Sequence, residues 1–329
     1  MRSSVPSSPP GSPPLEPREA LEALEAREPR EARPAVRVGV VGAGPMGTAL
    51  VTHLVRAGHP VGCYDLRPDA LDGAVAAGAS AASSPADLAA RSGLVLTFLP
   101  GPAQVREVAL DPAAGVLAGL PEGGLMLDMS TCGPATAEEL GAAFAARGRR
   151  FVDCPVSRKA PDMTVLVGGE PGVLGAAEDI LRSVSRSVLY CGRAGAGYTV
   201  KLLNQHVKYA WYLASVEALA VSRALGVDPG LAADAIEQCS GGESGLSTAA
   251  TYFRGDTDGM RTHAPSTTIA KDMELARGLA ELSGVPSAAL HATADFFTRV
   301  TGTPYRDLPY PESSALLSPD GDETHGGTV

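Results

Sequence analysis

Short apolar runs alternate with helix-like patterns along the first part of this chain. From Val36 to about residue 197, each run is followed by a stretch in which apolar residues recur every three or four positions. Such alternation predicts parallel strands joined by crossover helices, so we expect an α/β fold with a doubly wound, mainly parallel sheet. The expected strands are 38–41, 61–65, 94–99, 125–128, 151–153, 164–167 and 188–191.

Strand patterns stop after Gly197, and helical periodicity follows over about 198–225, 229–239, 266–283 and 286–300. The first 35 residues are poor in apolar side chains, so burial cannot offset the entropy lost on ordering them. The predicted organisation is a disordered extension over 1–35, a sheet domain over 36–195, an all-helical domain over 196–301, and a docked or loose tail over 302–329.

Composition narrows the classes of function. The net charge of −10 argues against a non-specific nucleic-acid binder. No apolar run is long enough to span a membrane. Five scattered cysteines without a Cys-x-x-Cys pair predict reduced thiols in a cytoplasmic protein, and no residue spacing indicates a metal site.

A glycine-rich turn follows the first apolar run. Gly42, Gly44 and Gly47 have the spacing Gly-x-Gly-x-x-Gly, with Pro45 and Met46 between the last two, and a helical pattern follows. The first glycine permits a tight turn, the second leaves room for a pyrophosphate, and the third lets the helix pack on the sheet. The helix then directs its positive end at the phosphates. We therefore expect NAD or NADP to bind at these five residues.

An acid ends the second predicted strand. Asp65 follows the glycines at the ~20-residue distance expected of a carboxylate that binds the adenosine ribose. Because a carboxylate repels a 2′-phosphate, Asp65 predicts NAD, although the nearby Arg67 leaves NADP possible. The alternative is an ordinary glycine turn followed by a solvated acid.

A second glycine-rich turn, residues 192–197, opens the long predicted helix. Lys201, Asn204 and Gln205 follow at i, i+3 and i+4, so they share one helix face. That face starts at the predicted junction of the two domains, where substrate clefts form. A lone helical lysine is usually solvated, but apolar neighbours surround Lys201 in the sequence, which favours a chemical role.

Several motifs together resemble those of the β-hydroxyacid dehydrogenases, a family that includes 3-hydroxyisobutyrate dehydrogenase and 6-phosphogluconate dehydrogenase. The resemblance covers about residues 36–316. It rests on 39–47, Leu99-Pro100 with Val105, 128–131 with Pro134, 153–157, the turn and helix 192–205, 271–276 and 312–316.

The resemblance implies hydride transfer between NAD(P) and a small carbonyl or alcohol, in a homo-oligomer (dimer or tetramer) formed through the helical domain. Lys201 resembles the family's proton donor and acceptor, and Asn204 resembles the residue that orients this lysine or the substrate. The other implied contacts are Leu99, Pro100 and Lys271 with the cofactor, and Ser130, Thr131, Ser157 and Gln205 with the substrate.

The chain departs from the family pattern after Ser157. Arg158 and Lys159 stand where the family has a pair of glycines, and Gln205 stands where a second Asn is usual. Either the two cations bind an anionic group of the substrate, or they turn into solvent.

Two other functions stay open from the sequence. The related imine reductases reduce C=N bonds but often replace the lysine, so Lys201 favours C=O chemistry. A non-catalytic NAD(P)(H)-binding protein is disfavoured by the intact Lys201 and Asn204. The prediction is a cytoplasmic NAD(P)-dependent dehydrogenase or reductase with a small-molecule substrate.

Overall fold

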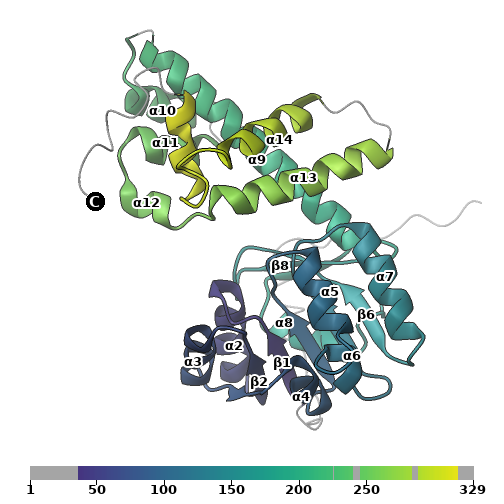
Figure 1. Cartoon of the computed structure of the whole chain (residues 1–329). Coiled ribbons are helices and arrows are strands. Elements are labelled where there is room, and N and C mark those ends of the chain that lie inside the picture. Colours follow the sequence, from purple (N-terminus) through teal and green to yellow (C-terminus); the bar gives the residue numbers. More distant parts are fainter. Residues whose placement is uncertain (1–35, 225, 240–244, 284–287, 318–329) are drawn as a thin grey trace, which may run out of the picture. The chain divides into compact units, whose positions relative to one another are not determined.

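The computed structural model describes residues 36–224, 226–239, 245–283 and 288–317. Its first part is a six-stranded sheet in the order β3-β2-β1-β4-β5-β6, and every neighbouring pair of strands is parallel. The doubly wound parallel fold expected from the sequence is thereby confirmed (Figure 1). The strands are β1 (Val38–Val41), β2 (Val61–Tyr64), β3 (Ser80–Ala81), β4 (Leu94–Thr97), β5 (Leu125–Asp128) and β6 (Arg150–Asp153).

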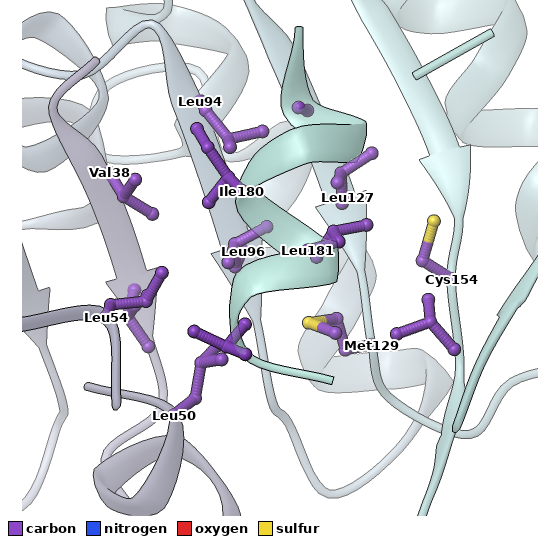
Figure 2. Packing of buried hydrophobic residues seen from close by; sticks show 14 of the residues in the cluster. Val38, Leu50, Leu54, Leu94, Leu96, Leu127, Met129, Cys154, Ile180 and Leu181 are labelled. Carbon is purple, nitrogen blue, oxygen red and sulfur yellow. The ribbon is translucent and has the colours of Figure 1, made fainter. Parts of the chain in front are cut away.

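Helices cover both faces of this sheet because alternate strand residues point to opposite sides. Leu94 and Leu96 pack with one set of helices, whereas Val95 between them packs with the other. Figure 2 shows Ile180 and Leu181 from the first set lying over the strands. That set is α2 (Pro45–Arg56), α3 (Pro68–Ala76) and α8 (Ala177–Ser183), and the other is α4 (Pro85–Ala90), α5 (Pro102–Leu110), α6 (Val116–Gly119) and α7 (Pro134–Ala145).

The last three strands form a small second sheet instead of extending the first. They are β7 (Val156–Ser157), β8 (Thr164–Val167) and β9 (Ser187–Tyr190), with β7 antiparallel to β8. The chain turns out of β6 at Pro155, which has no N–H to donate to a ladder. The backbone N–H groups of Leu166 and Gly168 donate to the carbonyls of Pro155 and Asp153, so the second sheet is joined to the end of β6.

Helices make up the rest of the described chain. The long helix α9 (Ala196–Ala224) begins against β6 and β8 and continues among α10 (Pro229–Glu237), α11 (Gly245–Phe253), α13 (Ser266–Ser283) and α14 (Ala288–Val300). A short α12 (Thr257–Arg261) and the 3-10 helix η1 (Tyr310–Leu317) complete the region. The described part of the predicted tail is docked, since Tyr310 packs edge-on against Tyr209 and Tyr212 and all three are buried.

Some expectations lie outside the described residues. These include the extension 1–35 and the end of the tail, 318–329, and the division into four segments stays a prediction. In the part of the chain that the structure describes, no helix is both long and apolar enough to cross a membrane.

Candidate active site

The glycine turn after β1 forms an open cradle. Gly42 has φ +95, and a Cβ there would lie 2.1 Å from the carbonyl oxygen of Phe98, so only glycine fits. A Cβ on Gly47 would lie 1.8 Å from the carbonyl oxygen of Gly42, which explains the close approach of α2 to the turn. No atom lies within 4 Å of a Cβ built on Gly44. This open space stands before α2, whose N-terminus has no side-chain cap, and it fits a pyrophosphate.

Asp65 is held beside this cradle at the end of β2. One carboxylate oxygen accepts from the N–H of Ala43 at 2.7 Å, and the other accepts from the N–H of Arg67 at 2.8 Å. The Arg67 guanidinium lies 3.7 Å from the same carboxylate and is largely exposed. The carboxylate therefore has a fixed orientation that suits a ribose, with a cation next to it.

Two loops at the same edge of the sheet are tied together by Ser130. Its hydroxyl accepts from the N–H of Leu99 at 2.8 Å and donates to Asp128 at 2.6 Å. The carbonyl oxygen of Pro100 accepts from Nζ of Lys271 at 3.1 Å, which links helix α13 to this loop. The structure therefore brings Leu99, Pro100, Ser130 and Lys271 together, while Thr131 lies half-buried beside Ser130.

Lys201 lies in a buried polar group formed by two helices. Its Nζ donates to Oε1 of Gln205 at 3.3 Å, and Nε2 of Gln205 donates to Asp272 at 2.8 Å. Asn204 is exposed but donates to the same Gln205 oxygen at 3.4 Å. Lys271 forms an ion pair with Asp272 at 2.7 Å. All three residues of the predicted helix face thus meet, and α13 supplies the acid.

Burial sets the protonation of Lys201. Only 8% of the residue is exposed, and this desolvation lowers the pKa of its ammonium to about 8. The negative charge of Asp272 opposes the decrease in pKa, while the positive charges of Lys208 and Lys271 add to it. An amine with a pKa near neutrality can both give and take a proton under physiological conditions.

Two buried acids that the sequence reasoning left without a role fix the start of α9. Asp153 accepts from the N–H groups of Gly195 and Tyr198 at 2.9 and 3.0 Å, at the positive end of the helix. The hydroxyl of Tyr198 donates to Asp128, which also accepts from Thr97 at 2.5 Å. A sequence signal existed, because Asp128 and Asp153 end successive strands at the same edge of the sheet where Asp65 follows β2. In the sequence, Asp272 was identified only as the residue next to Lys271 in the segment 271–276.

Ser157, Arg158 and Lys159 form a separate group at β7. Ser157 is half-buried, and the two cations are exposed. Arg158 has φ +67, a left-handed conformation in which glycine is favoured and an arginine is strained. Among the described residues, no hydrogen bond or ion pair joins these three side chains to the Lys201 group. The structure brings together the cofactor edge and the Lys201 helix, and leaves this group unlinked to them.

The chain resembles known dehydrogenases over most of its described length. Residues 37–192 match the NAD binding domain of 6-phosphogluconate dehydrogenase, and 195–308 match the NAD-binding region of NADP-dependent 3-hydroxyisobutyrate dehydrogenase. The chain is 36% identical over 210 residues to L-threonate dehydrogenase of Cupriavidus necator, covering 62% of this chain and 70% of that protein. It is 33% identical over 209 residues to mitochondrial 3-hydroxyisobutyrate dehydrogenase of Rattus norvegicus, a match that spans 62% of each chain.

Solved structures agree with this relationship. Mycobacterium tuberculosis 3-hydroxyisobutyrate dehydrogenase with L-serine superposes with a TM-score of 0.77 at 26% identity, covering 86% of this chain and 99% of that chain. An imine reductase from Pseudomonas sp. shares the fold alone, with a TM-score of 0.53 at 19% identity, covering 85% and 98%. The cofactor is NAD(P), and the chain belongs to the β-hydroxyacid dehydrogenase family.

Proposed function

We propose that this protein is an NAD(P)-dependent oxidoreductase that interconverts a small β-hydroxy acid and its carbonyl form, with Lys201 as the general acid and base. The observation that carries the proposal is the buried Lys201, whose pKa is lowered to about 8 and whose Nζ is held by Gln205. The contact between Lys271 and Pro100 brings the helix that supplies Asp272 to the cofactor loop. The sequence relatives named as hydroxy acid dehydrogenases support the same reaction class.

In this mechanism NAD(P), when bound, supplies or accepts the hydride. During oxidation the neutral amine of Lys201 takes the proton from the substrate hydroxyl, and during reduction its ammonium returns that proton to the carbonyl oxygen. Gln205 holds Nζ in place and links it to Asp272, which keeps the ammonium available despite burial. Asn204, exposed beside Gln205, can bond the substrate directly.

The substrate's acidic group has two places to bind in this proposal. The hydroxyl of Ser130 is bonded to Leu99 and Asp128, and its backbone N–H donates to Asp128 at 3.3 Å, so the half-buried Thr131 is the available group on that loop. Ser157 with Arg158 or Lys159 offers the second place, where the strained backbone of Arg158 fits a functional loop. Arg158→Ala and Lys159→Ala each test this: a direct anion contact should reduce kcat/KM roughly ten-fold.

Imine reduction is the second candidate, and the imine reductase fold is its support. Protonated Lys201 suits a carbonyl oxygen that must gain a proton, whereas an iminium nitrogen reaches the site already charged. Assays with β-keto acids, semialdehydes and cyclic imines, followed by NADH and NADPH absorbance, separate the two reactions. Lys201→Met should lower the kcat for the carbonyl substrates roughly 10²–10⁴-fold while NADH binds with unchanged affinity. If more than about a tenth of kcat survives, Lys201 is not the proton donor.

A homo-oligomer is part of the proposal. Val200, Leu203, Val207 and Trp211 recur along one face of α9 and are each 38–56% exposed. Apolar side chains in a continuous helical stripe favour burial against another helix. A cytoplasmic location is proposed as well, because all five cysteines are free thiols.

A further inference from the structure

Lys208 stands out because lysine is rare in this chain. The sequence contains 4 lysines and 23 arginines, so arginine is its ordinary surface cation. Of the four lysines, Lys208 and Lys271 both act electrostatically on Lys201, and Asp272 acts on Lys201 and on Lys208. A chain of net charge −10 therefore gathers three ammonium groups at its candidate active site.

The position of Lys208 follows from helix geometry. It lies seven residues after Lys201 on α9, two turns along the same face, so the two Cα atoms are about 10 Å apart. Two flexible lysine side chains and a short acyclic substrate can bridge that distance. The residue is also accessible to solvent, as a ligand-binding group must be.

Aromatic rings hold the Lys208 ammonium without neutralising it. Its Nζ lies 5.0 Å from the ring centroid of Tyr209 and 5.8 Å from that of Tyr310, both of which are buried. Such cation–π contacts fix the position of the cation and favour its charged form. Desolvation lowers the pKa of Lys208, and the negative charge of Asp272 opposes that decrease. His263 packs edge-on against the same Tyr310 ring, and burial lowers the pKa of its imidazole, which favours the neutral ring over a further cation.

The cluster has too few carboxylates for its cations. Within the described ranges, no acidic side chain forms an ion pair with Lys208. Asp272 is the acid that acts on it, but that carboxylate already accepts from Gln205 and pairs with Lys271. Three ammonium groups thus share one carboxylate, which leaves a place for negative charge supplied by a ligand.

We propose that Lys208 is a second anion-binding residue of the active site, and that the physiological substrate is a dianion with a carboxylate or phosphate at the end remote from its first acidic group. This inference rests on the proposed function, since it extends the substrate class of the Lys201 site. Lys208 acts on binding of the remote anion, whereas Lys201 moves the proton.

The test compares three substrates with one carbon skeleton. L-Threonate has a neutral hydroxymethyl group at C4, L-tartrate has a carboxylate there, and 4-phospho-L-threonate has a phosphate. For the wild-type protein, kcat/KM for at least one dianion should exceed that for L-threonate by roughly ten-fold or more, because a charged hydrogen bond has that effect. The dianion with the higher kcat/KM shows whether the remote group is a carboxylate or a phosphate.

Variants then assign the effect to Lys208. Lys208→Met should remove the preference for the dianion, and Lys208→Arg should retain a large part of it. The ratio between substrates is the readout, because any indirect effect through Lys201 changes both substrates alike. Arg91→Met is the control for charge: Arg91 is the C-cap of α4 and precedes β4, at the amino ends of the strands, so the substitution should leave the ratio unchanged.

Two results would overturn the proposal. One is a wild-type protein that shows no preference for either dianion, and the other is a Lys208→Met variant that keeps the preference. If none of the three compounds is turned over, the same ratio is measured as Kd by titration calorimetry on the NADH-saturated protein. The proposed function is judged separately, by whether Lys201→Met abolishes turnover of any accepted substrate.

Discussion

At the scale of single residues, the site depends on one lysine whose charge is unfavourable where it lies. Burial of Lys201 lowers its pKa to about 8, and Asp272, acting through space and through Gln205, opposes that decrease. A buried lysine without such a partner can titrate several units lower. The acid on α13 is therefore what keeps Lys201 able to exchange protons at neutral pH.

The pH dependence of turnover should follow Lys201. Oxidation needs the neutral amine, so its kcat/KM should rise with pH and level off above about 8, whereas reduction should fall above the same pH. Asp272→Asn removes the charge that raises the lysine pKa, so both midpoints should move down by roughly one unit. Glu274→Gln is the control, since Glu274 is paired with Arg277 on the same helix. If Asp272→Asn lowers kcat with unmoved midpoints, its role is structural only.

Asp65 should determine the choice of cofactor. Its carboxylate is oriented by two backbone N–H groups and can accept from ribose hydroxyls, but it repels a 2′-phosphate. We expect a higher kcat/KM with NADH than with NADPH in the wild-type protein, and Asp65→Ser should narrow or reverse that ratio by roughly ten-fold. Asp69→Ser, an exposed acid in the first turn of α3, should change nothing. A clear NADPH preference of the wild-type protein contradicts the assignment.

At the scale of elements, α9 has two different faces. One carries Lys201, Gln205 and the buried tyrosines, and the other carries the exposed apolar stripe. Asp153 fixes the first turn through the N–H groups of Gly195 and Tyr198, so the direction of the helix is set at the sheet. Because its first turn is anchored in this way, α9 holds both faces in a fixed orientation relative to the sheet.

The exposed stripe on α9 should mediate self-association. A charge at Val207, its most exposed member, would have to be buried unpaired in a helix–helix interface. We expect Val207→Glu to lower the oligomeric state, measured by sedimentation or by light scattering after size exclusion. Leu231→Glu is the control, because Leu231 is an exposed apolar residue of α10 outside the stripe. An unchanged mass for Val207→Glu would place the interface elsewhere.

At the scale of the whole molecule, the active site costs stability. The pKa of Lys201 is about 8 in the folded protein and 10.5 for a solvated lysine, so the folded state binds fewer protons between these two pH values. Stability due to this group therefore rises as pH increases through that window, and below pH 8 the full penalty applies. The difference in pKa corresponds to about 3 kcal/mol.

Replacing Lys201 should therefore make the protein more stable and less active. Lys201→Met should raise the free energy of unfolding near pH 7 by up to about 3 kcal/mol, and the gain should shrink as pH approaches 10. Denaturant titrations of the wild-type protein and the variant at pH 7 and 10 measure the difference between their free energies of unfolding. The contributions of the other titrating groups cancel in this difference. If the two proteins had the same free energy of unfolding at pH 7 and at pH 10, the Lys201 ammonium would be well solvated in the folded state.

The sequence by itself determined the features that depend on neighbours along the chain. Gly42, Gly44 and Gly47 could be identified because each steric requirement concerns a turn of a few residues. The structure has close contacts at Gly42 and Gly47 and open space at Gly44. The long helix and the strands other than β3 and β7 were also predicted, since side-chain periodicity reflects local geometry and those two strands have only two residues each. The small second sheet was missed because its strand pairing depends on the turn at Pro155.

Only the tertiary structure decided how distant groups meet. The bond between Gln205 and Asp272 spans 67 positions, and the bond between Tyr198 and Asp128 spans 70. No periodicity along the chain encodes such contacts, because they depend on how α13 crosses α9 and on where strands end in the sheet. Burial is the second reason: the same lysine would be an ordinary solvated cation on an isolated helix, and it becomes a proton carrier only where packing removes its water.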